Sequence, residues 1–297
     1  MRVNPDSTSN LISYLSGLKR QQESSLQQIA SGRRVQVPSD DPAAMAAVIQ
    51  NTALSSRSDE YLQSISSLNQ FFSTADGALN AVVTGLERAV TLGVEGGTGT
   101  LSEANRKSLA QEVSGIREQV LSLANLSFRG AYVFAGARST TQPFVEDSSS
   151  LSGIRYDGSS EVNKVEIGDR RFVALGLSGD TIFDGPGANV FGVLHQLTSA
   201  LESNDIEGIR RATTDIRGAL DHVSAMRVSY GNSMNQLELD QSFLEQSKLQ
   251  MESRENDLIG ADPAEAISRL QQVQFARDAT LAAAARTQYT SLLDYLE

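Results

Sequence analysis

The chain has 297 residues, no cysteine and a formal net charge of −11. The missing cysteines exclude disulfides, thiolate metal sites and cysteine nucleophiles, and the acidic balance disfavours nucleic acids and anionic membrane surfaces, which bind concentrated basic faces. Aromatic residues make up only 6% of the chain, which suits long helices that meet along narrow seams better than one thick globular core.

The N-terminal segment predicts one moderately amphipathic helix, from about Asn4 to Ala30, followed by an extended connector. The apolar positions of this helix recur at helical spacing at Leu11, Leu15, Leu18, Leu26 and Ile29. Residues 1–10 lack the long apolar run of a secretory signal, and no apolar stretch is long enough to span a bilayer. We therefore expect no membrane insertion and, if the protein leaves the cell, export without a cleavable signal peptide.

A long helix is predicted from Pro42 to about Val94. Asp40 and Asp41 could form a paired-carboxylate site for acid–base chemistry or a cation, but the proline that follows them favours a helix cap. Small and apolar residues then alternate in steps of four and three, which is typical of a coiled-coil-like seam. The seam contains Tyr61, Ile65, Leu68, Phe72, Ala75, Leu79, Val82, Leu86, Ala89 and Gly93.

The glycine-rich run from Gly93 to Gly99 ends this helix, and Ser102 can cap a second one. No Gly-Lys-Ser/Thr follows the run, so a flexible turn between helices is favoured over a phosphate cradle. The second stripe contains Leu109, Val113, Ile116, Val120 and Leu123. We expect the two helices to form an antiparallel hairpin.

Residues 139–190 predict a small β-rich insert with turns at Asp157-Gly158 and Gly168-Asp169. Helix returns near Val190, with an apolar stripe that begins at Ile216 and ends at Leu258. Polar residues fill some positions of this seam and could set its register at some loss of stability. They are Arg227, Gln241, Lys248 and Glu255.

The last predicted helix follows Asp262 and Pro263, which repeat the cap-and-proline start, and Glu265 could complete a capping box. His195 and His222 have no partner histidine at metal-ligand spacing, so we interpret both as surface or seam residues. The fold class predicted is mainly α: an elongated bundle of long coiled-coil-like helices formed by N- and C-terminal arms, with a small β-rich insert. Its expected segments are 1–41, 42–138, 139–190, 191–257 and 258–297.

Several motifs resemble the flagellin superfamily. Ser31-Gly32-Arg33-Arg34-Val35 and Pro38-Ser39-Asp40-Asp41-Pro42 match its N-terminal signature, in the form typical of hook-associated members rather than of filament flagellins. Tyr132-Val133-Phe134-Ala135-Gly136 and the ending from Thr290 to Leu296 are also similar to that branch. The resemblance covers both arms of the chain and is weakest over about 145–190.

The resemblance implies paired terminal helices at the inner core of a tube, a second shell built by the long helices, and an insert that faces outward. It also implies a structural subunit of the extracellular bacterial flagellum at the hook–filament junction, exported with the help of a flagellar export chaperone. The expected partners are further copies in a ring at the hook tip, hook-associated protein 1 and flagellin. Alternatives are a flagellin-type filament subunit and a soluble helical signalling or binding module.

We expect no catalytic residue, cofactor or metal, because no candidate constellation is favoured over its structural explanation. The predicted function instead needs apolar terminal helices that pack between subunits. The predicted assembly residues are Leu11, Leu15, Leu18, Leu26, Ile29, Ile267, Leu270, Val273, Leu281, Leu292, Leu293 and Leu296. The predicted caps and connector residues are Arg33, Arg34, Asp40, Asp41, Pro42, Asp262 and Pro263.

Overall fold

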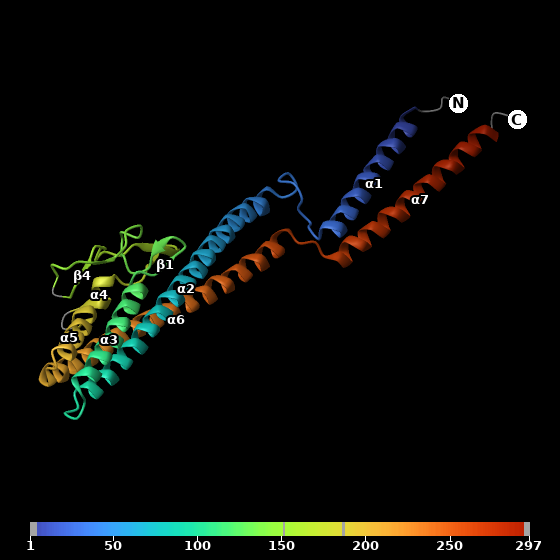
Figure 1. Ribbon diagram of the computed structural model, residues 1–297. Helices are drawn as coiled ribbons and strands as arrows, with labels where there is room; N and C mark the ends of the chain where they lie inside the picture. The colour runs from blue at the N-terminus through green and yellow to red at the C-terminus, as the bar shows by residue number, and fades with distance from the viewer. Residues whose placement is uncertain (1–4, 151, 186–187, 294–297) are drawn as a thin grey trace. The chain divides into compact units, whose positions relative to one another are not determined.

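The computed structural model describes residues 5–150, 152–185 and 188–293, and the side chains of these ranges from residue 9 to residue 285. The described part of the chain is mainly helical, as predicted (Figure 1). Its helices are α1 (Pro5–Ser31), α2 (Pro42–Gly96), α3 (Glu103–Ala124), α4 (Gly179–Phe183), α5 (Val190–Glu202), α6 (Ile206–Ile259) and α7 (Pro263–Leu293).

The strands form short antiparallel pairs rather than one sheet. β1 (Ser127–Phe128) pairs with β2 (Ala131–Tyr132), β3 (Phe144–Glu146) with β4 (Ile154–Tyr156), β5 (Lys164–Gly168) with β6 (Arg171–Ala174), and β7 (Asp184–Gly185) with β8 (Ala188–Asn189). The turn predicted at Gly168-Asp169 joins β5 to β6 and is confirmed. Asp157-Gly158 is only a bend after β4, because β4 pairs back onto β3 instead of forward.

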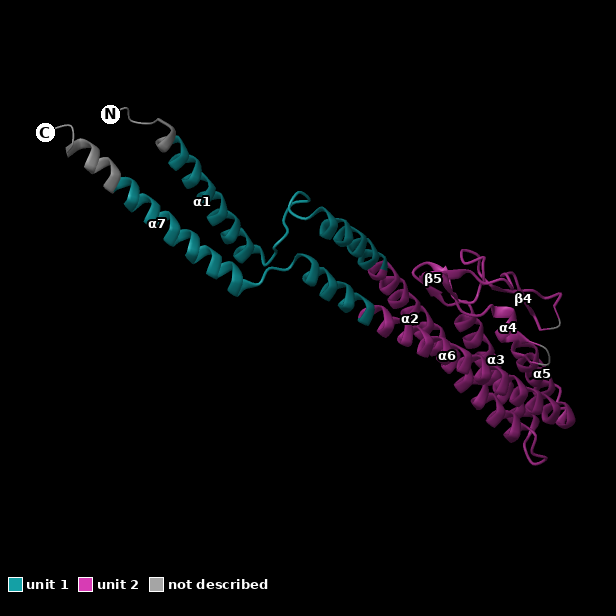
Figure 2. Ribbon diagram, turned by 180° about the vertical axis from the view of Figure 1, so that it is seen from behind, with its two compact units in different colours: residues 1–57, 246–297 teal, residues 58–245 magenta. Residues whose placement is uncertain are grey.

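The chain divides into two compact units (Figure 2). We call residues 1–57 and 246–297 the terminal unit and residues 58–245 the central unit. The division falls inside α2 and α6, each of which contributes to both units. The expected segments place boundaries at 41 and 258 instead, at the ends of these helices.

The core of the central unit is built on the predicted seam of α2. Every seam residue from Ile65 to Ala89 is buried, and Tyr61 packs against the cluster. α6 runs antiparallel to α2, with the ring centroids of Phe72 and Tyr230 5.7 Å apart. Gly93 permits a close approach of these helices, because a Cβ there would collide with the Thr213 side chain.

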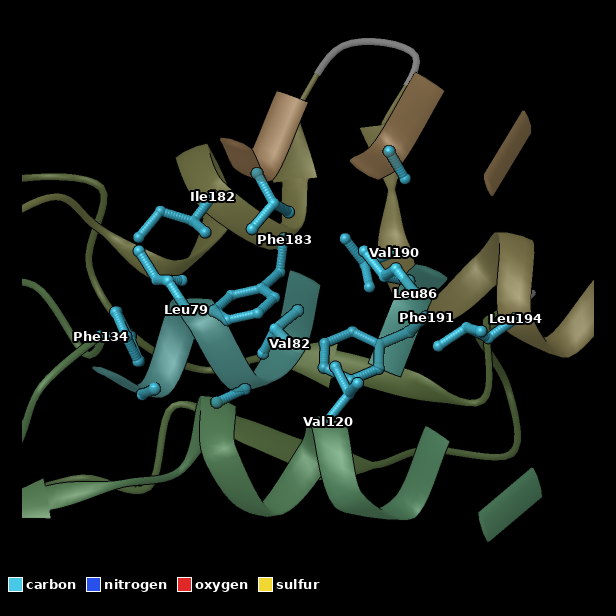
Figure 3. Close-up of a cluster of buried hydrophobic side chains, with 14 of the residues drawn as sticks. Leu79, Val82, Leu86, Val120, Phe134, Ile182, Phe183, Val190, Phe191 and Leu194 are labelled. Carbon is cyan, nitrogen blue, oxygen red and sulfur yellow. The ribbon is translucent and has the colours of Figure 1, made fainter. Parts of the chain in front are cut away.

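Aromatic side chains fix the β-rich insert and α4 on the helices (Figure 3). Phe183 lies 5.5 Å from Phe134 and 5.3 Å from Phe144, measured between ring centroids. In Figure 3, Phe134, Phe183 and Phe191 lie close to Leu79, Val82 and Leu86 of α2 and Val120 of α3, and Phe144 belongs to the same cluster. The insert is therefore part of the central core and not a separate domain.

The returning helix predicted from Val190 is interrupted. α5 ends at Glu202 and α6 begins at Ile206, and between them Asn204 adopts a left-handed backbone with φ of 59°. Asparagine tolerates this conformation better than most residues, so the chain turns here without glycine or proline. Ser102, by contrast, caps α3 as predicted, since its Oγ accepts from the N–H of Asn105 at 3.2 Å.

Candidate assembly interface

Two connectors join the helices of the terminal unit, and they hydrogen bond to each other. The N–H of Arg34 donates to the carbonyl of Ile259 at 2.6 Å, and the N–H of Ala261 donates to the carbonyl of Gly32 at 2.9 Å. Gly32 adopts a φ of 67°, which a residue with a side chain rarely does. We call this pairing of residues 32–41 with residues 258–262 the connector joint.

The two predicted arginines fasten the connector joint from the N-terminal side. Arg33 Nη2 lies 3.1 Å from Glu255 Oε1, so this polar filler of the α6 seam has a partner across the joint. Arg34 Nη2 donates to the carbonyl of Leu258 at 2.9 Å and lies 3.4 Å from Asp41 Oδ2. Because both guanidinium groups are about half exposed, each ion pair contributes only modest stability.

Asp40 and Asp41 hold backbone groups and do not converge on a common site. Asp41 Oδ1 accepts from the N–H of Ala44 at 3.0 Å and so caps α2 ahead of Pro42. Asp40 Oδ2 accepts from the N–H groups of Gln36 and Val37 at 3.0 and 3.1 Å. These backbone hydrogen bonds lower the pKa of both carboxyls. The largest cause is the N–H of Ala44 for Asp41 and the N–H of Gln36 for Asp40.

Asp262 starts α7 in the same way, because its Oδ1 accepts from the N–H of Ala264 at 2.8 Å and of Glu265 at 3.3 Å. The predicted capping box is wrong, since Glu265 Oε1 lies 2.6 Å from Arg269 Nη2 one turn further along. Pro263 is the first residue of the helix, where its missing N–H is not needed.

A small apolar cluster supports the connector joint. It consists of Val35, Ala44, Val48 and Ile259, with Met45 and Leu258 packed against it. Nearby, Asn51 Nδ2 donates to the carbonyl of Met251 at 2.7 Å, which ties the start of α2 to the end of α6. The joint therefore couples segments from the two ends of the sequence.

Beyond the joint, α1 and α7 pack side by side (Figures 1 and 2). Arg277 Nη1 donates to Gln22 Oε1 at 3.0 Å across the pair. A groove of about 430 Å³ runs between the helices. Its lining includes three predicted assembly residues, and consists of Leu15, Lys19, Gln22, Glu23, Leu26, Arg277 and Leu281.

The predicted assembly residues differ in how far this pairing covers them. Leu18 is buried, whereas Leu11, Leu15, Leu270 and Val273 are half-buried. Leu26, Ile29, Ile267 and Leu281 are exposed, with Leu26 retaining 47% of its accessible surface. The side chains of Leu292, Leu293 and Leu296 lie outside the described residues.

Other exposed apolar residues on these helices escaped the stripe analysis. Phe275 of α7 is 78% exposed, and Ile12 and Tyr14 of α1 are exposed as well. These residues lie off the main stripe, but large apolar side chains in otherwise polar surroundings are a usable signal. Within the chain, the terminal helices thus cover one part of their apolar surface and leave another part open to solvent.

Outside the terminal unit, the candidates for chemistry remain isolated. His222 Nε2 lies 2.8 Å from the carbonyl oxygen of Thr181, and His195 is exposed on α5. Among the described residues there is no cluster of three or more histidine and carboxylate side chains that could hold a metal ion. The same residues include no helix with the length and apolar character needed to cross a bilayer.

Comparison with known families finds a match for each of the two arms of the chain. The bacterial flagellin N-terminal helical region matches residues 6–139, and the bacterial flagellin C-terminal helical region matches residues 213–296. These two matches include the connector joint and the α1–α7 pair. Between them lie most of the β-rich insert and α5.

Individual relatives extend these matches. Flagellar hook-associated protein 3 of Escherichia coli (strain K12) is 28% identical over 260 residues, covering 80% of each chain. Flagellin of Listeria innocua is 24% identical over 244 residues, covering 82% of this chain and 80% of its own. The crystal structure of Bacillus cereus FlgL shares the fold, with a TM-score of 0.59 at 20% identity, over 70% of this chain and 97% of its own.

Proposed function

This chain belongs to the flagellin superfamily, since it carries both of the superfamily's helical regions, and we propose that it is the structural subunit of the hook–filament junction of a bacterial flagellum. The observation that carries this proposal is the α1–α7 pair. It gathers both ends of the chain on one body and leaves apolar residues from both helices exposed. Arg33, Arg34, Asp40 and Asp41 of the signature stabilise the connector joint, from which both helices of the pair extend.

Assembly is driven by burial of the open apolar surface between subunits. Covering a side chain such as Leu26, Ile267 or Phe275 completely contributes about 1.5–3 kcal/mol before ordering costs are subtracted. Terminal helices that gain order on assembly lose conformational entropy, which this burial offsets. The subunit catalyses no reaction in this proposal.

The proposed partners are those that the resemblance to the superfamily implies, and the hook-associated name of a relative agrees with assembly at the hook. Copies of the chain form a ring at the hook tip, bind hook-associated protein 1 below and offer a template to flagellin above. A flagellar export chaperone guards the chain until it leaves the cell. Hook-associated protein 3 is favoured over flagellin because the Pro-Ser-Asp-Asp-Pro motif and the higher identity point the same way.

Deleting the gene separates the junction subunit from a filament subunit. A cell that lacks the junction subunit still makes and exports flagellin, which should accumulate as monomer in the medium, and the wild-type gene should restore filaments. If the chain is itself the filament subunit, the filament is lost and no other flagellin appears outside the cell. That outcome would contradict the junction proposal.

A pair of substitutions tests the α1–α7 surface directly. Leu26→Glu should abolish filaments while the purified chain keeps its far-ultraviolet circular dichroism, because the side chain is already exposed. Gln27→Glu, at the exposed neighbouring position, is the matched control and should preserve motility. Equal motility of both variants would remove the proposed role of this surface.

Amide hydrogen exchange distinguishes an assembly subunit from a self-contained binding module. Residues 1–41 and 258–297 should exchange much faster than the central unit in the purified chain and become strongly protected on assembly. Protection of both ends in the monomer equal to that of the central unit would favour the module.

A further inference from the structure

The central unit carries an apolar groove outside the α1–α7 pair. Its volume is about 550 Å³, and its floor is the face of α2 that presents Ser67, Leu68 and Phe71. Phe128 and Ala131 of β1 and β2 form one wall, whereas Val165 and Leu175 form another. A hollow of this size accommodates several large side chains.

The same unit carries an apolar ridge on α6. Val228, Leu239 and Phe243 are 63%, 67% and 62% exposed. Successive helical residues are about 100° apart, so Leu239 and Phe243 lie about 20° and 60° around the helix from Val228. Leu237, on the buried seam, lies about 180° from Val228. The ridge is therefore the side of α6 opposite its core.

We propose that the α6 ridge of one copy docks into the groove of a second copy. This inference rests on the proposed function, since it supplies the contact between neighbouring subunits of the ring. The groove and the ridge share no residue. A contact between them can therefore repeat head-to-tail from one copy to the next, and contacts of that kind close into rings or continue as helical arrays.

The charges beside the two surfaces favour a contact between groove and ridge over a contact between two ridges. Glu238 and Glu245 flank the ridge and are exposed. On the groove side, the guanidinium of Arg129 lies 5.2 Å from the ring centre of Phe128, and Lys164 is exposed next to Val165. Glu60 lies in the groove as well, but two ridges placed against each other would oppose only like charges.

The absence of cysteine allows a direct test. Ser67→Cys places a thiol in the groove, and Ser242→Cys places one beside the ridge. Each variant is oxidised alone, and a mixture of the two variants is oxidised in parallel. The experiment uses both the concentrated purified chain and flagellated cells that produce both variants. We expect a crosslinked dimer only in the mixture. Ser108→Cys, at an exposed position of α3, replaces the groove variant as control and should give none.

The outcomes separate this inference from the proposed function. A 67–242 crosslink in either setting supports the docking, whereas a Ser67→Cys product on its own indicates a twofold contact and overturns it. If neither setting gives a 67–242 product, the inference is also overturned, even when the chain is found at the hook tip. Flagellin leakage from the deletion strain continues to test the junction role independently.

Two phenylalanine substitutions measure how much the ridge contributes to the docking. Phe243→Ser should lower the yield of the 67–242 crosslink about tenfold or more, because a large apolar side chain no longer leaves water. Phe172→Ser is the matched control, since Phe172 is 58% exposed but belongs to neither surface. Equal losses in the two variants would contradict the ridge as the docking element.

Discussion

The central and terminal units use similar helices but bury very different amounts of apolar surface. In the central unit, α2, α3, α5 and α6 enclose one continuous core to which the β-rich insert also contributes. In the terminal unit, the buried cluster at the joint contains only four residues. The difference shows that helical periodicity alone does not produce a self-sufficient core, because a pair of helices has too few neighbours to cover its apolar stripes.

The largest test of this comparison is Phe183→Ala in the central unit. Phe183 is fully buried among Phe134, Phe144 and Phe191, so its truncation should cost about 3–5 kcal/mol of unfolding free energy. Val48→Ala in the terminal unit should cost about 1–2 kcal/mol, since it removes fewer methyl groups from a smaller cluster. Urea unfolding followed by circular dichroism measures both, because the chain has no tryptophan for fluorescence.

Amide exchange should localise the two effects. Phe183→Ala should raise exchange throughout the central unit, whereas Val48→Ala should raise it only around the connector joint. Equal and global losses of protection in both variants would mean that the two units unfold as one, and the comparison would fail.

Arg106→Met tests a polar anchor of the central unit. Arg106 is 3% exposed, and its guanidinium donates to the carbonyls of Gly96, Thr98 and Leu101 and to Asn204 Oδ1 at 2.6–2.9 Å. It thereby joins the turn after α2 to the turn before α6. Loss of these charge-assisted bonds should cost about 2–3 kcal/mol.

The exposed neighbour of Arg106 supplies the control. Lys107→Met breaks only the surface pair between Lys107 and Glu103 and should change the unfolding free energy by less than about 0.5 kcal/mol. If Arg106→Met is as mild as Lys107→Met, the turns hold together without the guanidinium.

A pair of glycine substitutions sharpens the description of the terminal unit. At both Gly32 and Gly17, the position that a Cβ would take has no heavy atom within 4 Å apart from the adjoining backbone and chain neighbours, so alanine collides with no other part of the protein at either site. Gly32→Ala should nevertheless cost about 1–2 kcal/mol, because its φ of 67° lies in the left-handed region. Gly17→Ala should instead stabilise by up to about 1 kcal/mol, since it lies inside α1.

Opposite signs in this pair are the decisive result, and urea midpoints with exchange of α1 amides measure them. The same sign for both variants would mean that backbone geometry at the connector joint has little influence on the terminal unit.

Much of the fold could be predicted because its signals are local. Asp41, Ser102 and Asp262 each announce a helix start through atoms within a few residues, and the α2 seam needs only its own periodicity. The break at Asn204 was missed because no glycine or proline marks it, although three helix-disfavouring residues in a row, Ser203 to Asp205, offered a weak signal.

The candidate site was predictable only in part, because several of its contacts join residues that are far apart in the sequence. The caps were foreseen, but Arg33 pairs with Glu255 and Arg34 donates to the carbonyl of Leu258, and both of these contacts span more than 200 residues of the chain. Pairing over that distance depends on how the whole chain folds back. The burial of Arg106 was missed similarly, because a lone arginine in a helix is ordinarily solvated.

The smallest expected effect is the acid response of the connector joint. The N–H of Ala44 holds the pKa of Asp41 below its ordinary value, so the carboxylate stabilises the folded state above about pH 4. That contribution is lost as the pH falls through the lower folded pKa. Asp41→Asn keeps a good capping oxygen but cannot titrate in this range, so protection of the Ala44 amide, corrected for intrinsic exchange, should fall between pH 6 and pH 3 only in the wild type.

Asp40 provides an internal reference within the same variant. Its carboxylate still titrates in Asp41→Asn, so the Gln36 and Val37 amides should keep their acid sensitivity there while Ala44 loses it. Unchanged Ala44 protection from pH 6 to pH 3 in the wild type would show that the cap does not depend on the charge of Asp41. Separate responses of Ala44 and Gln36 would instead show that the two adjacent carboxylates act independently, Asp41 on the start of α2 and Asp40 on the connector. Local hydrogen bonds of this kind let the terminal unit keep its connector joint without a large apolar core.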